Sequence, residues 1–422
     1  MKTHQPYRIS HISLHEPVEM PELDHHQGNY LVFWWKTIPL GDLYLEPGTN
    51  TSTDEYYKAM GQAILPTLNH YAQNPAELKA NYLATTSPDK LKNLQSWLPA
   101  NLQITATEII PEKVAVSVVV CTRNRAAHLK CCLTMLQNLT CRPAEIIVID
   151  NAPTDESTRE VVSAFSEVKY IREPRPGLDI ARNTGVSNAK FPIVAFTDDD
   201  VSVHPLWTYQ IWQTFEKPQV AAMTGLVIAA ELATEAQYIF EKHWSFNRGY
   251  TDVKYDSDFF RKTLRKGPPV WNIGAGANMA FRREIFEEVG YFDELLDVGA
   301  AGCNGDSEMW YRILKAGHTI HYNPRAVAFH EHRKEIEGLK KQLFYYMRGY
   351  TAAALLQQQQ LQQAGYAKQI FWVLPRHYLR LLRSGFPHYS YRYRTIAAEM
   401  LGVLSGLAYY IKNKRPNTKL SR

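Results

Sequence analysis

Short apolar runs alternate with amphipathic segments through the middle of the chain. Four apolar runs are typical of strands buried on both faces, and they lie at residues 116–121 (VSVVVC), 145–150 (EIIVID), 168–172 and 193–197. Helical periodicity fills the intervals, at residues 126–139, 158–165 and 178–188. Strand and helix therefore alternate repeatedly, which predicts an α/β fold with a mostly parallel sheet and flanking helices.

The region before this alternation, residues 1–113, has a different pattern. Residues 30–36 (YLVFWWK) and 43–45 predict two strands, with a turn at residues 39–41 between them. Residues 53–71 have a helical apolar pattern, and Ser87-Pro88 is typical of a further helix start. These features predict an N-terminal accessory α+β unit without evident chemistry of its own.

The region after the alternation is predicted to be helical. We therefore divide the chain into an accessory region, residues 1–113, a core, residues 114–335, and a C-terminal helical region, residues 336–422. A length of 422 residues agrees with two or three such units. Residues 366–422 carry eleven Lys or Arg residues and a single acid, Glu399, so the segment has a charge of +10 while the whole chain has +5.

Composition excludes several classes of protein. With 45% hydrophobic and 21% charged residues, the chain has the profile of a globular protein rather than a disordered or fibrous one. Its first residues lack the apolar run of a signal peptide, and the most apolar long segment, residues 396–411, is too short to span a membrane and contains Glu399. The five cysteines match no disulfide framework or zinc site, so we expect free thiols and a cytoplasmic location.

Candidate chemistry gathers where the predicted strands end. Asp198, Asp199 and Asp200 follow one of these strands directly. Adjacent carboxylates repel one another unless a cation lies among them, and hard oxygen ligands suit Mg²⁺ or Mn²⁺. A solvated acidic turn would give the same pattern, but ligands of parallel α/β sheets bind at the carboxyl ends of strands. The sequence therefore predicts a divalent metal site here.

Polar residues also follow the first two strands. Thr122, Arg123 and Arg125 come after the first strand, and Arg side chains suit phosphate groups. Asp150 and Asn151 end the second strand, where the Asp could accept a hydrogen bond from a base or ribose. Each motif could also be an ordinary surface turn, and only their joint order favours a nucleotide site.

Two later motifs complete the candidate set. Asp306 precedes the helical run MWYRILKAG, so it lies near a helix N-terminus, where it could serve as a base or simply as a cap. The preceding residues 297–305 are rich in glycine, as expected of a loop close to a ligand. His330 and His332 follow the apolar stretch AVAF and would share one face of an extended strand, so either could complete a metal site.

Taken in order, these motifs resemble glycosyltransferase family 2 and its GT-A fold. The matching segments are VSVVVCTRNR, EIIVIDNAPTD, GLDIARNTGVSNA, VAFTDDD, GANMAFRREIFEEVGYFDE, GDSEMWYRI and AVAFHEHR. They cover residues 114–332, about half of the chain. Members of the family use nucleotide-sugar donors and invert the anomeric configuration, so an α-linked donor yields a β-glycoside.

The resemblance implies a role for each candidate. Thr122, Arg123, Arg125, Asp150 and Asn151 would hold the nucleotide, and Arg182 would assist. Asp198 and Asp200 would be the ends of a DxD motif that binds Mn²⁺ or Mg²⁺ and the diphosphate, with Asp199 as an adjacent candidate. His330 would be a late metal ligand, with His332 as the alternative, and Asp306 would be the general base. One departure stands out, because many members carry Glu-Asp where this chain has Gly305-Asp306.

Other functions remain open at this point. A sugar nucleotidyltransferase would also combine an α/β sheet with acidic metal ligands, but no glycine-rich phosphate loop with a following Lys occurs near the first strand. A non-catalytic nucleotide-sugar binding module is a second alternative because of Gly305. Nucleic-acid binding by the basic tail is disfavoured, since its basic residues alternate with long apolar helices.

The basic tail predicts a further partner. Residues 376–383 combine an apolar stripe with a basic one, formed by Tyr378, Leu381 and Leu382, and by Arg376, Arg380 and Arg383. Basic amphipathic helices rich in aromatic residues bind anionic membrane surfaces, which would place the protein peripherally on the inner face of a membrane. Such a location suits a lipid-linked or saccharide acceptor in surface polysaccharide or glycolipid assembly. Equally, these helices could pack on the core with their charges in water.

Overall fold

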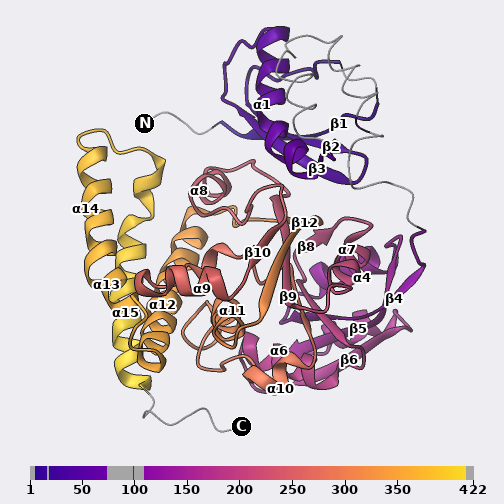
Figure 1. Cartoon of the computed structure of the whole chain (residues 1–422), viewed down its shortest axis with the longest axis vertical. Helices are drawn as coiled ribbons and strands as arrows, with labels where there is room; N and C mark the ends of the chain where they lie inside the picture. Colours follow the sequence, from indigo (N-terminus) through magenta and orange to yellow (C-terminus); the bar gives the residue numbers. More distant parts are fainter. Residues whose placement is uncertain (1–4, 17–18, 74–97, 99–108, 415–422) are drawn as a thin grey trace.

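A sheet of nine strands forms the centre of the structure, a computed structural model that describes residues 5–16, 19–73, 98 and 109–414 (Figure 1). The helix start predicted at Ser87-Pro88 lies outside these residues. The strands are β4 (Lys113–Thr122), β5 (Arg142–Asn151), β6 (Val168–Glu173), β7 (Ile193–Asp198), β8 (Val201–Val203), β9 (Val220–Ala229), β10 (Val253–Tyr255), β11 (Met279–Arg282) and β12 (Thr319–His330).

The order of strands in this sheet confirms the predicted α/β class. It runs β10-β12-β9-β11-β7-β4-β5-β6, and β8 pairs with β12. Strands β6, β5, β4 and β7 are mutually parallel, as are β9 and β12. The hydrophobic pattern of the sequence did not predict β11, which lies antiparallel between β7 and β9. Its four residues are too few for periodicity to distinguish them from a loop.

Helices cover both faces of the sheet. The core helices are α4 (Ala126–Gln137), α5 (Ser157–Ser163), α6 (Leu178–Asn188), α7 (Trp207–Thr214), α8 (Glu235–Trp244), α9 (Ser257–Thr263), α10 (Ile285–Val289) and α11 (Gly305–Lys315). Val118 and Val120 of β4 pack in one apolar cluster with residues of α4 and α7, whereas Val119 packs in another with residues of α6 and α11. Because successive strand residues point to opposite faces, an uninterrupted apolar run is needed to cover both layers.

The N-terminal region forms a small sheet that packs on the core. Its elements are β1 (Tyr7–Ser13), β2 (Gly28–Trp35), β3 (Ile38–Leu45) and the helix α1 (Thr53–Tyr71). Along β2, Leu31 and Phe33 contact the α1 side, and Val32 and Trp34 pack with residues of β9 and β12. Trp34 also stacks on His204, with ring centroids 5.8 Å apart. The run YLVFWW is thus apolar throughout because both faces of β2 are covered.

The turn that joins β2 and β3 was predicted at the wrong residues. Residues 39–41 belong to β3, and the chain reverses at Lys36-Thr37 instead. Lys36 has a φ of 53°, the left-handed conformation that tight hairpins require. A register shift between Phe33 and Trp34 places Pro39 opposite Trp34. Proline and glycine marked the turn in sequence, but here they are tolerated within a strand with an irregular ladder.

The C-terminal region is helical, as predicted, and its helices lie together along one edge of the molecule, in orange and yellow (Figure 1). They are α12 (Ile336–Gln360), α13 (Tyr366–Lys368), a π-helical turn at Gln369–Val373, α14 (Leu374–Gly385), a 3-10 turn at Tyr391–Arg394 and α15 (Ile396–Asn413). In the part of the chain that the structure describes, no helix is long and apolar enough to cross a membrane. All five cysteines are free thiols, as expected.

Candidate active site

The strand register brings the polar motifs to one edge of the sheet. Thr122, at the end of β4, pairs with Asp150 of β5, and the neighbouring Cys121 pairs with Asp198 of β7. Parallel strands share one carboxyl edge, so all three motifs end on the same side. The prediction that these clusters gather at the carboxyl ends of the strands is confirmed.

Asp198, Asp200 and His330 form a group with the geometry of a metal site. Each offers one ligand atom, and these atoms all lie within 4.8 Å of one another. Asp198 ends β7 and His330 ends β12, two strands that are separated in the sheet by β11 and β9. Two carboxylates with one imidazole are a donor set that Mn²⁺ accepts readily. The residues present therefore fit a divalent cation.

The electrostatics of this group agree with that fit. Burial and the nearby charge of Asp200 raise the pKa of Asp198 to about 7, a repulsion that a cation would relieve. Burial raises the pKa of Asp200, but neighbouring basic groups, among them the ion-paired Arg125, outweigh this and hold it below its ordinary value. Burial and His332 lower the pKa of His330 to about 4. His330 is therefore neutral near pH 7, as a metal ligand must be.

Asp199 has different partners from its two neighbours. Its carboxylate accepts a hydrogen bond of 2.6 Å from the Thr122 hydroxyl and lies 2.6 Å from Nη1 of Arg125. The other end of the same guanidinium, Nη2, lies 2.9 Å from Oδ2 of Asp200. Arg125 thus bridges two consecutive carboxylates, and Asp199 fixes the backbone between Asp198 and Asp200.

A large cavity of about 1070 Å³ opens beside these residues. Of the residues that the sequence predicted, it is lined by Thr122, Arg123, Arg125, Asn151, Arg182, Asp198, Asp199, Asp200, Asp306 and His330. Asp150 and His332 do not line it. Asp150 is fully buried and accepts a hydrogen bond of 2.8 Å from Tyr170. His332 is 3% exposed and lies 2.8 Å from Glu241 and 3.1 Å from His330.

Arg182 lies at the centre of a buried acidic cluster that forms part of the cavity wall. Its Nη1 is 3.0 Å from Oδ1 of Asp179 and 2.6 Å from Oδ2 of Asp297. A Cβ added at Gly276 would lie 2.9 Å from Nη2 of Arg182 and 3.0 Å from Oδ2 of Asp306, so both groups approach that glycine. Burial and the charge of Asp297 raise the pKa of Asp306. The single positive charge of Arg182 is thus shared among several carboxyl groups and cannot neutralise all of them. Their mutual repulsion favours a proton on one of these groups.

Asp306 is the second residue of helix α11 and lines the cavity. The backbone N–H of Ser307 donates a 2.6 Å hydrogen bond to Oδ1 of Asp306, and Asp306 is among the cavity-lining residues. A carboxylate at this position is stabilised by the helix N-terminus. A raised pKa and access to the cavity are the properties of a general base.

The structure explains the glycine that precedes Asp306. A Cβ added at Gly305 would lie only 2.0 Å from Oδ2 of Asp179 and 2.5 Å from its Cγ. Both residues are buried, and Oδ2 of Asp179 has no hydrogen-bond partner within the described residues. The carboxylate of Asp179 therefore occupies the space in which a side chain at position 305 would begin.

Comparisons with known proteins point to one family. The Glycosyl transferase family 2 profile matches residues 117–290. A glycosyltransferase from Haloferax volcanii is 27% identical over 234 residues, which cover 54% of this chain and 70% of that protein. The pre-mycofactocin glycosyltransferase of Mycobacterium tuberculosis is 26% identical over 248 residues, which cover 58% of this chain and 48% of that protein.

The chain contains a glycosyl transferase family 2 domain. It spans about half the length of the mycobacterial relative. Among solved structures, a mannosyltransferase from Pyrobaculum calidifontis in complex with GDP-mannose and Mn²⁺ is similar at 18% identity, with a TM-score of 0.46 over 73% of this chain and 91% of that one. A likeness at this level says nothing about the ligands of this chain.

Several residues that line the cavity or pair with its charged groups were missed by sequence reasoning. Aromatic side chains form part of the cavity wall, and they are Trp244, Phe246, Trp271, Tyr345, Tyr346 and Tyr350. Aromatic residues are common throughout this chain, at 12%, so sequence offered no way to select these six. Asp179 and Asp297 were missed as partners of Arg182, although Asp179 and Arg182 have the i, i+3 spacing of a helical ion pair.

Proposed function

We propose that the family 2 domain is an inverting glycosyltransferase that moves a sugar from a nucleoside-diphosphate donor to an acceptor hydroxyl. The observation that carries this proposal is the convergence of Asp198, Asp200 and His330 on the cavity that also contains Asp306. A metal-binding group and a candidate base then face one space that is large enough for a substrate.

The donor is held at the carboxyl edge of the sheet. This part of the cavity is lined by Arg123, Thr122 and Asn151, which would contact the nucleotide and its phosphates. Asp198, Asp200 and His330 would hold Mn²⁺ or Mg²⁺, which supplies positive charge to the leaving diphosphate when bound. Arg125 orients Asp200 through their 2.9 Å ion pair, and Asp199 steadies Arg125 in turn. Asp150 is buried and does not line the cavity, so any contribution that it makes to donor binding is indirect.

Asp306 takes the proton during transfer. The acceptor oxygen bonds to the anomeric carbon while the bond from that carbon to the diphosphate oxygen breaks, and the nucleoside diphosphate leaves with the electron pair. The proton of the acceptor hydroxyl passes to the Asp306 carboxylate. Its raised pKa suits this task, because a stronger base accepts a proton more readily. Attack from the face opposite the leaving group converts an α-linked donor into a β-glycoside.

The acceptor approaches along the aromatic wall. Trp244, Trp271 and Tyr345 present flat apolar faces with polar edges, and such surfaces suit sugar rings or the head of a lipid-linked saccharide. A saccharide or lipid-linked acceptor fits surface polysaccharide or glycolipid assembly.

A mass-spectrometric screen tests the proposal. The purified protein is incubated with a panel of nucleotide sugars, Mn²⁺ and simple saccharide or lipid-linked acceptors. A glycosylated product with release of nucleoside diphosphate supports transfer. Release of pyrophosphate from a nucleoside triphosphate and a sugar phosphate would instead reveal a nucleotidyltransferase. Binding of a donor without turnover, with or without acceptors, would leave a non-catalytic binding module.

A further inference from the structure

Large apolar side chains on the surface are concentrated in the C-terminal helices. Within the described residues, ten of the fourteen exposed ones lie between positions 371 and 411, and they are Phe371, Trp372, Val373, Leu379, Phe386, Tyr389, Met400, Leu401, Leu404 and Ile411. Scattered apolar residues on a surface need no explanation, but a concentration on neighbouring helices marks an interaction site.

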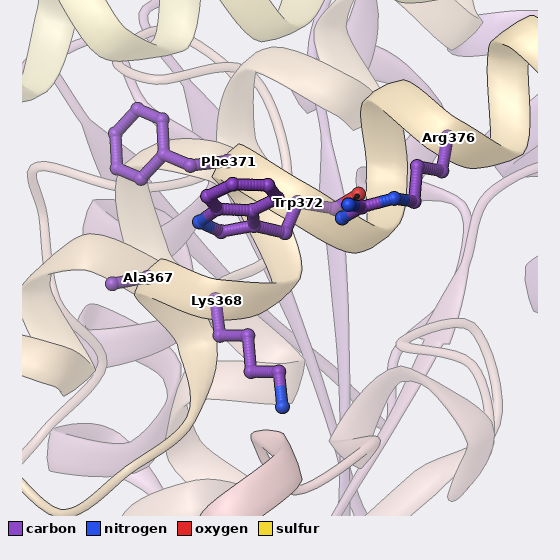
Figure 2. Close-up of a pocket in the computed structure, with 5 residues that line it drawn as sticks. All are labelled: Ala367, Lys368, Phe371, Trp372 and Arg376. Carbon is purple, nitrogen blue, oxygen red and sulfur yellow. Dashed lines mark hydrogen bonds between the residues drawn. The ribbon is translucent and has the colours of Figure 1, made fainter.

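Apolar and basic residues share one face of α14 and the turn before it. Trp372, Arg376, Leu379 and Arg383 follow one another at spacings of four, three and four residues, which places them on one side of a helix. Trp372 and Leu379 are 58% and 60% exposed. Figure 2 shows the indole of Trp372 beside the guanidinium of Arg376, whose carbon lies 4.6 Å from the ring centroid, with Phe371 and Lys368 nearby. We call this set, with Lys368, Phe371 and Arg380, the α14 face.

The opposite side of α14 faces inward. Tyr378 is 5% exposed, and its hydroxyl donates a 3.2 Å hydrogen bond to Glu399 of α15. Leu381 and Leu382 are half-buried. The apolar stripe predicted from sequence therefore packs largely against the protein, while the predicted basic stripe, Arg376, Arg380 and Arg383, is exposed. The exposed apolar residues are others, chiefly Phe371, Trp372 and Leu379.

The charge of this region is of one sign. Between residues 366 and 414 the single acid is Glu399, which is 1% exposed and paired with Arg392. Arg376, Arg380 and Arg383 form no ion pair with any residue that the structure describes. An occupant of the α14 face must therefore accept both apolar side chains and several uncompensated positive charges. An anionic lipid bilayer offers both, because its headgroups carry negative charge above an apolar interior.

We propose that the α14 face docks on an anionic lipid bilayer and brings the cavity to the membrane surface. Val373 links the two features, because it is 53% exposed and also lines the cavity. Leu374 and His377, two residues in the first turn of α14, line the cavity as well. The proposal also names a lipid-linked saccharide as the acceptor class, and this part of it rests on the proposed function. Docking itself needs no turnover.

Helix α15 has a second apolar stripe on its outer side. Met400, Leu401, Leu404 and Ile411 are each exposed by 41% or more. The other side of the helix carries glycines, and a Cβ at Gly402 would lie 2.3 Å from the backbone oxygen of Phe344 in α12. Close packing on α12 through small residues leaves the larger apolar side chains outside, where a bilayer could cover them.

Flotation with the full chain tests the proposal. Vesicles of phosphatidylcholine alone are compared with vesicles that contain phosphatidylglycerol. We expect binding to the anionic vesicles that weakens with salt, since each basic residue at such a surface contributes about 1 kcal/mol, or roughly fivefold in partitioning. The triple variant Arg376→Gln, Arg380→Gln, Arg383→Gln should then bind on the order of a hundredfold more weakly. Trp372→Ser with Leu379→Ser should also weaken binding.

A matched control removes the same charge elsewhere. Arg159, Arg172 and Arg261 have side chains exposed by 69%, 52% and 72%, and their triple Gln variant should bind anionic vesicles as the wild type does. Equal loss in both triple variants would overturn the proposal, because net charge alone would then explain binding. No binding to vesicles at low salt would also overturn the proposal, because the helices would then serve only structural packing. Preferential binding to nucleic acid would overturn it as well. None of these outcomes depends on transfer activity, so failure here is distinct from failure of the proposed function.

Discussion

Replacement of Gly305 by alanine tests how tightly the acidic cluster is built. The added Cβ would lie 2.0 Å from Oδ2 of Asp179, whereas carbon and oxygen atoms that are not bonded need more than 3 Å or so. Asp179 would have to move by roughly 1 Å or more, yet it is buried and ion-paired with Arg182 at 3.0 Å. Overpacking of this kind costs about 1–3 kcal/mol, and breaking the buried pair would add to it.

Urea unfolding measures this cost, and Gly338→Ala provides the control. Gly338 lies in α12, and a Cβ there would meet no atom closer than 3.8 Å. Alanine is the better helix former, so Gly338→Ala should leave stability unchanged or raise it by up to about 1 kcal/mol. Gly305→Ala should lower the free energy of unfolding by about 1–3 kcal/mol or more.

The cause is isolated by a second substitution. In an Asp179→Ala background the space beside position 305 is open, so Gly305→Ala should cost at least about 1 kcal/mol less than in the wild type. A Gly305→Ala variant as stable as the wild type would refute the packing described here. So would an equal cost in both backgrounds, because the clash would then not involve Asp179.

Three further predictions concern the site itself. Asp306→Asn keeps its shape but cannot take the proton, so we expect donor binding to survive while kcat falls by roughly 10²-fold or more; normal turnover with a dead Glu308→Gln variant would move the role to Glu308. Because burial and Asp297 raise the pKa of Asp306, the pH–rate profile should lose activity, as pH falls, at a pKa above the ordinary aspartate value of about 3.9; an acid limb at or below that value would contradict this. Calorimetry should show that His330→Ala weakens Mn²⁺ binding more than His332→Ala does. His332→Ala acts only through His330 and should weaken binding by about 10–100-fold. If His330→Ala bound Mn²⁺ as the wild type does, His330 would not be a ligand.

Much of the fold follows from the sequence because burial on both faces leaves a clear pattern. The apolar runs of β4 and β5 and the helical period of α6 were located correctly from residue types alone. The convergence of Thr122, Asn151 and Asp198 on one edge also followed, since parallel strands order their ends. Periodicity records which faces are covered, and in these elements that suffices.

Other features depend on contacts that periodicity does not record. Side-chain direction at the end of β7 decides which carboxylates join the candidate metal group and which lies against Thr122 and Arg125, so Asp199 could not be separated from Asp198 and Asp200. The pairing of Arg182 with Asp297 joins residues 115 positions apart. Likewise, the exposure of Trp372 and the burial of Tyr378 follow from how α14 packs and not from their similar chemistry.

Metal-dependent release of nucleoside diphosphate tests the central claim most directly. With the donor identified by the screen, release is measured in EDTA, after addition of Mn²⁺ or Mg²⁺, and in Asp200→Ala with the same ions. We predict no release in EDTA, recovery with either ion, and a loss of at least about tenfold to thousandfold in Asp200→Ala. Full release in EDTA, or wild-type turnover by Asp200→Ala, would contradict the assignment of Asp198, Asp200 and His330 as the metal site of a glycosyltransferase.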